Sequence, residues 1–591
     1  MHANALDGLV AITALALSFL PAVFFARRAG KGTAEFFASG RAAPWWLIGT
    51  SMVATTFSTD TPNLVTDFVR SSGVSQNWAW WAFLITGMTT VFFYSRLWRR
   101  SGVLTDLEFY ELRYSGRSAV AVRGFRAIYL GLFFNCVIMA TVTLAATKIA
   151  NVMLGWGRLQ TVIVCTLVAI PFASLSGLWG VMASDMVQFT IAMVGVFAAA
   201  YYALQHPQVG GLDGLVEKLD PATLSLLPDF GNGELLMAVL IIPLTVQWWA
   251  VWYPGAEPGG GSYVAQRMLA AKDERHALAG TLWFNIAHYA LRPWPWLIVA
   301  LSSMLVFPTL GDIQTALPHV SPGLLGNDLA FPAMLTLLPH GVLGILLASL
   351  FSAYVSTIST HLNWGSSYVV NDFYRRFIRP DADEQHLVRL SRVLTAVLMV
   401  LAALISFGLD TASTAFQLLL SIGAGTGLIY LLRWFWWRIN AWSEIAAMVS
   451  SFAITLGLYV ARGRGLELSD TAALLLSVGT TTVVWLAVTF LTPPTDRETL
   501  GRFYLKVRPA GPGWTAVRAE CGGEPSPDSM TQSIIGSLAG CFAVYGALFG
   551  VGYLLYGQLA AAAFCLVLVA GSSVVLWRVM ARMLARPLVE G

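Results

Sequence analysis

Hydroxyl side chains gather in one apolar part of the chain, ASLFSAYVSTISTHLNWGSS at residues 348–367. On a helix turning by about 100° per residue, Ser352, Ser356 and Thr360 fall within one arc of about 120°. The same arc holds Ser349, Ser359, Asn363, Ser366 and Ser367. Such a stripe faces protein or water, because hydrocarbon offers no hydrogen-bond partner. Its oxygens could replace the hydration shell of a hard cation, or its small residues could simply let helices pack closely.

A second unusual stretch, TTFSTDTP, occupies residues 55–62. Pro62 lacks a backbone donor and its ring clashes with the carbonyl group of Ser58, so the helix should break or kink there. Broken helices at mid-membrane commonly form ion and solute sites. Asp60 favours such a site over a simple proline kink, because a carboxylate inside a membrane is costly. Asp185, in VMASDMVQ, could add a second acid, or it could be an ordinary acid near a helix N-terminus.

The elements that position these residues are membrane helices. The chain has 591 residues, of which 56% are hydrophobic and only 12% charged, whereas soluble domains carry roughly 25% charged residues. With about 20 apolar residues per span, the sequence predicts fifteen transmembrane helices. They lie near 6–26, 43–69, 76–97, 119–153, 158–176, 181–204, 235–255, 277–306, 341–373, 388–408, 412–434, 438–461, 470–492, 533–555 and 559–584.

The basic residues predict the orientation of the chain. Clusters such as RRAGK, FYRRFIRP and RVMARMLARP fall on one side of the membrane if the N-terminus is outside and the C-terminus cytoplasmic, as the positive-inside rule requires. We therefore expect a multi-pass protein of the cell membrane, with the lipid bilayer as its surroundings. The sequence shows no nucleotide-binding motif, and we expect no enzyme activity, no nucleic-acid partner and no obligatory protein partner.

Three motifs resemble the sodium:solute symporter family, which includes bacterial sodium/proline, sodium/galactose and sodium/sialic acid transporters. They are FFASGRAAPWW with VATTFSTDT, then VAQRMLAAKDERHA, and then VSTISTHLNWGSSYVVNDFYRRF. The resemblance covers about residues 6–508. It implies an all-α fold of the LeuT type, in which two inverted five-helix repeats each begin with an unwound helix. The breaks expected in this chain are at 58–62 and at YPGAEPGGGS, residues 253–262.

This fold divides the chain into six parts. The expected parts are an N-terminal transmembrane helix at 1–30, a first five-helix repeat at 43–204, an inverted second repeat at 235–434, two further helices at 435–492, a cytoplasmic linker at 493–532 and two C-terminal helices at 533–591.

The family resemblance also implies two sodium sites. The common site would use the backbone carbonyl groups of Ala54, Phe57 and Ala353 and the hydroxyl groups of Ser356 and Thr357. A second site, present in some members, would use Asp185, Ser356, Ser359 and Thr360. All these residues are present, which favours two coupled ions. The alternative is a carrier of one sodium ion in which Asp185 is structural or binds a proton.

Solute-binding candidates follow from the same resemblance. The hydroxyl groups of Thr56, Ser58 and Thr61 match positions used in the sialic acid branch, with Asp60 nearby; further candidates are Trp80, Asn135, Trp252, His288 and Gln417. Trp80 stands where sugar carriers place a glutamate, and His288 where they place a lysine. No arginine occurs near Asn135, where the sialic acid branch would have one. The resemblance therefore does not allow a sugar or sialic acid to be assigned as the solute of this chain.

The sequence thus predicts a sodium-coupled symporter that imports a small organic solute by alternating access. One alternative is a proton-coupled carrier on the same fold, working through Asp60, Asp185 or His288. Another is a solute sensor that has lost transport. The sequence does not identify the solute.

Overall fold

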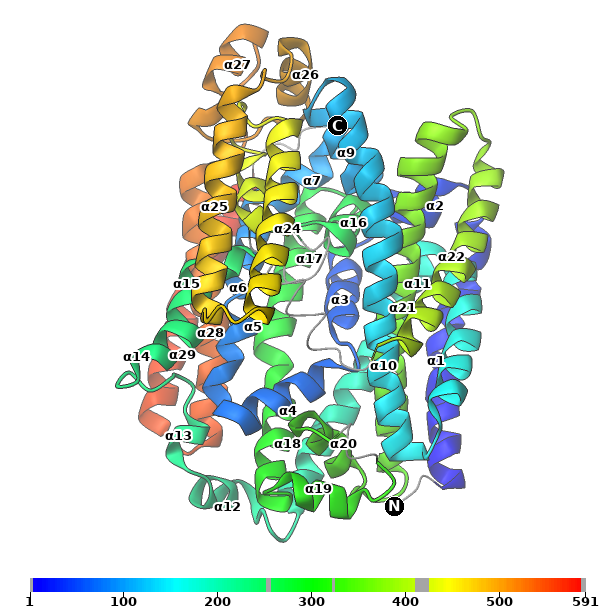
Figure 1. Cartoon of the computed structure of the whole chain (residues 1–591), viewed down its shortest axis with the longest axis vertical. Coiled ribbons are helices and arrows are strands. Elements are labelled where there is room, and N and C mark those ends of the chain that lie inside the picture. The colour runs from blue at the N-terminus through cyan, green and yellow to red at the C-terminus, as the bar shows by residue number, and fades with distance from the viewer. Residues whose placement is uncertain (1–3, 251–256, 321–324, 410–424, 586–591) are drawn as a thin grey trace.

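The computed structural model describes residues 4–250, 257–320, 325–409 and 425–585. Within these ranges the regular secondary structure is helical, apart from one bridge between Ala43 and Ala271. Figure 1 shows the long helices side by side, most of them running along the long axis of the molecule. This arrangement confirms the predicted fold class, since a helix satisfies its own backbone hydrogen bonds, as hydrocarbon requires.

Ten helices of the described residues are long and apolar enough to cross a membrane, or eleven if the bent pair Glu274–Val306 and Leu310–Ala316 is one span. They are α1 (Ala5–Ala29), Gly116–Leu154 (α9, η5 and α10), Arg158–Leu175 and Gly177–Gln205 (both in α11), Val342–Ile378 (α21 and η11), α22 (Glu384–Phe407), α24 (Ala441–Gly463), Thr471–Leu491 (in α25), α28 (Met530–Leu555) and α29 (Leu559–Leu584).

The other predicted spans are interrupted or lie partly outside the described residues. The span expected at 76–97 consists of α5 (Trp78–Trp81), α6 (Leu84–Thr89), η3 (Thr90–Tyr94) and α7 (Ser95–Ser101). The span expected at 235–255 consists of α14 (Gly233–Leu236), η6 (Met237–Ile241), α15 (Ile242–Thr245) and η7 (Gln247–Trp249). The span expected at 277–306 joins α17 (Glu274–Ile286), η8 (Ala287–Leu291) and α18 (Pro293–Val306). The span expected at 412–434 begins outside the described residues.

The break predicted at 58–62 is present. Helix α3 (Trp45–Thr56) ends before Phe57, and α4 (Thr61–Ser72) begins after Asp60. Pro62 lies in the first turn of α4, where its missing N–H and fixed φ suit a helix start. Proline therefore starts the second half of the broken helix, and the unwound backbone lies just before it.

The second break, expected at 253–262, lies partly outside the described residues. Its described end, residues 257–261, precedes α16 (Ser262–Ala270). Gly259 and Gly260 have φ of +83° and +93°, a region that glycine adopts without steric cost. A Cβ on Gly259 would also lie 2.9 Å from the ring of Tyr94. Without side chains, Gly259 and Gly260 let the backbone before α16 lie close to Tyr94 of η3 and Trp98 of α7.

The polar stripe of α21 (Val342–Ser367) faces the protein, as predicted. Each of its eight members is at most 2% exposed. Helix α21 packs against α11 (Arg158–Gln205), α1 and α3. Gly177 interrupts α11 with φ of 54°, and a Cβ there would lie 2.8 Å from that of Ala29. The part of α11 that carries Asp185 is therefore a separate helix directed along α21.

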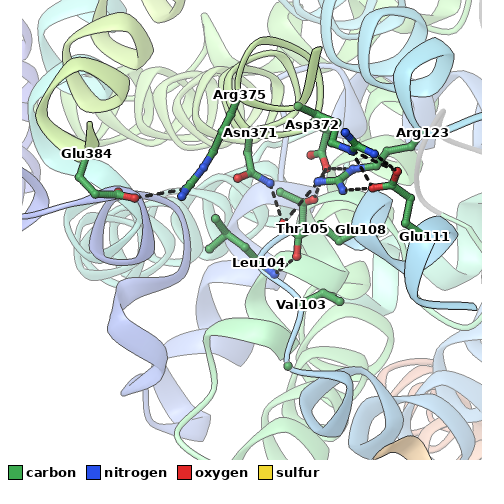
Figure 2. A network of polar contacts seen from close by, with 12 residues as sticks. Val103, Leu104, Thr105, Glu108, Glu111, Arg123, Asn371, Asp372, Arg375 and Glu384 are labelled. Carbon is green, nitrogen blue, oxygen red and sulfur yellow. Dashed lines mark hydrogen bonds and ion pairs between the residues drawn. The ribbon is translucent and has the colours of Figure 1, made fainter. Parts of the chain in front are cut away.

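An ion-pair network fixes the far end of this helix, where α21 continues into η11 (Tyr368–Ile378). Figure 2 shows Arg123 of α9 (Gly116–Ile128) between Asp372 of η11 and two acids of the segment before α9. The guanidinium lies 2.7 Å from Asp372, 2.6 Å from Glu111 and 3.4 Å from Glu108. Asp372 is fully buried, so Arg123 compensates a charge that would otherwise be costly.

The segment 493–532 is more structured than its expected description as a linker. It forms α26 (Arg497–Val507), η12 (Pro512–Trp514) and α27 (Thr515–Cys521), with Phe503 and Trp514 in the core. Asp528 then pairs with Arg96 at 2.6 Å and Arg100 at 3.1 Å, and both arginines also contact Glu274. Two buried cations and two acids thus join this segment to α7 and α17.

The bounds of the other helices follow. They are α2 (Thr33–Ala38), η1 (Ser39–Arg41), η2 (Val74–Asn77), η4 (Asp106–Glu108), α8 (Phe109–Arg113), η5 (Tyr129–Phe134), α10 (Asn135–Leu154), α12 (Gly211–Lys218), α13 (Pro221–Leu224), α19 (Leu310–Ala316), η10 (Asn327–Leu329), α20 (Ala330–Leu335) and α25 (Asp470–Leu491).

Candidate functional site

Asp185 lies at the contact between α11 and α21. Its side chain is fully buried and accepts hydrogen bonds from Ser356 at 2.6 Å and from Ser51 of α3 at 2.5 Å. It is two turns beyond Gly177, so the alternative of an acid at a helix N-terminus does not fit. The carboxylate instead joins the three helices that carry the predicted sodium ligands.

Arg267 of α16 completes this cluster, and the sequence pattern did not mark it as a site residue. Its guanidinium is fully buried, donates to Thr360 at 2.7 Å and to Ser51 at 3.1 Å, and lies 3.8 Å from Asp185. The available signal was an arginine inside VAQRMLAAKDERHA, directly after a predicted membrane break. A sodium ion bound here would share the carboxylate of Asp185 with the guanidinium of Arg267.

The predicted second sodium site is only partly assembled by these contacts. Asp185, Ser356 and Thr360 are linked through hydrogen bonds and through Arg267. The hydroxyl of Ser359, in contrast, donates to the carbonyl oxygen of Ser356 at 3.1 Å, a bond within its own helix. Thr360 also lies 3.0 Å from the hydroxyl oxygen of Thr55, and this contact joins the cluster to the end of α3.

The residues of the predicted common sodium site lie where the C-terminal end of α3 meets the middle of α21. Its five members, Ala54, Phe57, Ala353, Ser356 and Thr357, are at most 2% exposed. Thr357 Oγ1 donates to the carbonyl oxygen of Thr55 at 3.0 Å. A hydroxyl that donates its proton keeps its lone pairs for a cation, and neutral oxygens of this kind suit sodium, the co-transported substrate.

A cavity of about 190 Å³ lies beside this contact. Six of the nine predicted solute-binding residues line it, namely Thr56, Ser58, Asp60, Thr61, Trp80 and His288. Thr357 also reaches the cavity wall, so a sodium ligand and the solute candidates share one space. Drug-sized ligand pockets measure roughly 300–1,000 Å³, and the smaller volume here suits a small solute.

Asn135 is not among the described residues that line the cavity. Asn135 accepts a hydrogen bond at its Oδ1 from His361 Nδ1 at 2.7 Å and donates to the carbonyl oxygen of His361 at 2.8 Å. It thereby positions His361, which lines the cavity and to which the sequence assigned no role. Trp252 and Gln417 lie outside the described residues.

Arg292 enters the cavity from the end of η8, one turn after His288. Its side chain is buried, donates to Thr56 Oγ1 at 3.1 Å and lies over the ring of Trp296. It was not among the predicted site residues, although HYALRPWPW places an arginine inside a predicted span and such residues are functional by default. The cavity therefore contains an arginine, Arg292, although no arginine occurs near Asn135 in the sequence. It comes from a different helix.

Arg292 also fixes the proton arrangement of His288. Arginine cannot accept a hydrogen bond, so His288 Nε2, 3.2 Å from Arg292 Nη2, is the acceptor. His288 Nδ1 then carries the proton and donates to Thr56 Oγ1 at 3.0 Å, while Thr56 donates to the carbonyl oxygen of Val53. The imidazole is thus neutral, and a proton added at Nε2 would bring two cations into contact.

Comparisons with known proteins identify relatives of this chain. A model of the sodium:solute symporter family matches residues 36–451. A sodium/glucose cotransporter from Vibrio parahaemolyticus is 26% identical over 446 residues, covering 72% of this chain and 79% of that protein. The osmoregulated proline transporter OpuE of Bacillus subtilis (strain 168) is 27% identical over 297 residues, covering 49% of this chain and 55% of that protein.

The solved structure of a Na⁺-coupled sialic acid symporter in a substrate-bound outward-open state shares the fold. Its TM-score is 0.64 at 19% identity, and the match covers 83% of this chain and 99% of that chain. This similarity concerns the fold alone.

Proposed function

Because this chain belongs to the sodium:solute symporter family, it is a sodium-coupled solute symporter, and we propose that it imports a small organic solute together with two sodium ions by alternating access. The observation that carries this proposal is the position of Ser356 and Thr357. They belong to the predicted sodium sites, and Thr357 contacts both the end of α3 and the solute cavity.

Coupling between ion and solute follows from this contact. The carbonyl group of Ala54 lies in the last turn of α3 and that of Phe57 directly after it, and the residues that follow line the solute cavity. A sodium ion held between α3 and α21 would fix the unwound backbone in one conformation. Sodium then shifts the population toward the form that binds solute, because it binds that form more tightly.

Two ions are proposed because the two predicted sites use partly different oxygen groups. Asp185 and Thr360 would serve only the second ion. The backbone carbonyl groups of Ala54, Phe57 and Ala353 would serve only the first ion, and Ser356 would be shared. Each ion moving down a 100 mV potential releases about 2.3 kcal/mol, so two ions would supply about 4.6 kcal/mol before any concentration difference. This supports much steeper solute accumulation than a single ion.

Sodium coupling is favoured over proton coupling by the state of His288. A proton carrier needs a group that can take up and release a proton during the cycle, and His288 is held neutral against Arg292. Asp185 already has Arg267 beside it and two hydroxyl donors. A solute sensor without transport would bind solute but would not accumulate it in vesicles.

The proposed orientation places the N-terminus outside the cell and the C-terminus in the cytoplasm. It rests on the basic clusters, which lie on one side under this arrangement except for ARGRG at 461–465. Arg123 and Arg375, in the network of Figure 2, would then lie on the cytoplasmic side.

The test is a reconstitution experiment with purified protein in liposomes. Solute uptake should require an inward sodium gradient, should increase with an inside-negative potential, and should fail when potassium replaces sodium. Uptake that persists without sodium and collapses with the pH gradient would establish the proton-coupled alternative. Solute binding without uptake would establish the sensor.

A further inference from the structure

The solute cavity contains two opposite charges that do not neutralise each other. Arg292 and Asp60 both line it, yet no ion pair joins them. Among the residues that the structure describes, neither has an oppositely charged partner. In a membrane protein a charge inside the bundle is normally paired, so both groups require an explanation.

Arg292 is the positive group. Its side chain is 1% exposed, and its contacts are neutral: Thr56 Oγ1, the carbonyl oxygen of Val53, the ring of His288 and the ring of Trp296. Its Nε–H is buried and has no acceptor in the described part of the chain. A guanidinium with an unused N–H suits a carboxylate, which binds it by charge-assisted hydrogen bonds.

Asp60 is the negative group, at the end of the unwound segment. Its Oδ1 is buried and has no donor in the same described ranges. The hydroxyl group of Ser58 lies beside this carboxylate and lines the cavity with it. An ammonium group carries N–H donors and a positive charge, and so would pair with the carboxylate and donate to its free Oδ1.

One part of the wall is apolar. Leu64, Val65, Phe68, Phe83, Ile138 and Val142 line it between the charged groups and the bundle. These side chains offer no hydrogen bonds to a solute covered with hydroxyl groups. They instead favour a hydrocarbon body, whose burial contributes about 0.8 kcal/mol per methylene.

We propose that the solute is a small zwitterion, an amino acid with an apolar side chain, whose carboxylate binds Arg292 and whose ammonium group binds Asp60. This inference rests on the proposed function, since it names the solute class of the same cavity. Binding such a molecule pairs both resident charges and leaves the filled cavity electrically neutral, with the apolar side chain against the apolar wall.

Other solute classes leave a charge unpaired. A neutral sugar would leave both Arg292 and Asp60 without counter-charge, and a simple carboxylic acid would bring a second anion to Asp60. Burying an uncompensated charge is strongly unfavourable. A purely cationic amine would pair Asp60 but place a second cation in the cavity with Arg292.

The experiment is a thermal-shift and uptake screen on the full chain, each probe measured with sodium and with potassium. The probes are glycine, alanine, valine, leucine and proline, with D-glucose, D-galactose and lactate for comparison. We expect sodium-dependent stabilisation and uptake by at least one amino acid and none by the sugars or by lactate. For valine, 3-methylbutanoate and 2-methylpropylamine, which each lack one charge, should bind at least about tenfold more weakly.

Two substitutions test the assigned residues. Asp60→Asn should weaken binding of the amino acid by about tenfold or more while weakening the analogue without an ammonium group much less. Arg292→Gln should do the reverse, sparing the analogue without a carboxylate, and Arg292→Lys should recover part of the loss. Asp67→Asn, on the same helix but off the cavity wall, should change neither affinity.

The outcomes separate this inference from the proposed function. Sodium-dependent uptake of a sugar or of lactate, with no amino acid active, would overturn the zwitterion and leave the symporter intact. Stabilisation by sodium alone, with no response to any probe, would likewise overturn it. Absence of any sodium effect would instead overturn the proposed sodium sites. If Asp60→Asn does not fold, the charge-deleted analogues still decide the question in the natural protein.

Discussion

Thr357 Oγ1 of α21 donates a 3.0 Å hydrogen bond to the carbonyl oxygen of Thr55, in the last turn of α3. This bond joins the two helices at the point where α3 stops and the unwound backbone begins. The sodium ligands therefore lie where a small movement of α3 relative to α21 would also reshape the solute cavity.

Replacing Thr357 with valine keeps the shape of the side chain and removes its oxygen. We expect Thr357→Val to raise the sodium concentration needed for half-maximal uptake by about tenfold or more, since a buried oxygen ligand is lost. The measurement is uptake in proteoliposomes as a function of external sodium. Ser349→Ala is the matched control, because Ser349 lies on the same stripe but donates to Ala192 of α11. Equal sodium dependence in the natural protein and in Thr357→Val would disprove the site.

Thr360 and Ser359 both belong to the predicted second sodium site, but their hydroxyl groups have different partners. Thr360 contacts Thr55 and Arg267, whereas the hydroxyl of Ser359 is bonded within its own helix. We expect Thr360→Val to lower the number of sodium ions per solute from two to one, while Ser359→Ala has little effect. Ratios of radiolabelled sodium to solute flux measure this directly. A ratio of one in the natural protein would contradict the second site.

Asp185 and Arg267 should be coupled in stability. Either charge alone is buried without compensation, so Asp185→Asn or Arg267→Gln should each cost about 3–5 kcal/mol of unfolding free energy. The double substitution removes both charges and should cost less than the sum. The measurement is thermal unfolding in detergent, without sodium, of the natural protein, the two single variants and the double variant. Strictly additive losses would mean that the two groups do not compensate each other.

Proton gradients should drive little transport. His288 is held neutral between Thr56 and Arg292, so a proton has no favourable place at its Nε2. We expect an imposed pH gradient, without sodium, to give no solute accumulation above that of empty liposomes. Accumulation under those conditions, lost in His288→Gln, would show that His288 carries the coupling proton.

Arg123 and Arg376 should differ sharply although both contact Glu111. Arg123 also pairs with the buried Asp372, so Arg123→Gln should destabilise the protein by about 3–5 kcal/mol. The side chain of Arg376 is 44% exposed, and such surface pairs contribute only about 0–1 kcal/mol, so Arg376→Gln should be nearly neutral. Thermal unfolding of the two variants provides the comparison. Similar losses would mean that Asp372 does not depend on Arg123.

The sequence predicts the fold well where one chemical signal dominates. Long apolar runs identify the uninterrupted spans, and Pro62 with its polar neighbours identifies the broken helix. The angular position of the hydroxyl groups predicts that α21 is buried along one face, and it is. Resemblance to a known family supplies the repeat arrangement, which no local pattern of residues contains.

The parts that the sequence does not predict depend on distant residues meeting in space. Arg267 reaches Asp185 and Thr360 from a helix far away in the chain, and Arg292 enters the cavity from a different helix than the one where an arginine was sought. Asn135 looked like a solute ligand because of its position, but the structure turns it toward His361. Side-chain direction and partners come from tertiary packing, and neither follows from spacing along the chain.

A buried cluster of four charges limits truncation of the chain from its C-terminus. It consists of Arg96, Arg100, Glu274 and Asp528. Asp528 lies beyond residue 492, yet it supplies one of the two acids in a buried cluster that joins α7 to α17. Removing everything after 492 would leave two guanidinium groups competing for Glu274. Asp528 thus supplies a counter-charge to α7, and we expect a version truncated at 492 to lose stability unless Arg96 or Arg100 is also replaced.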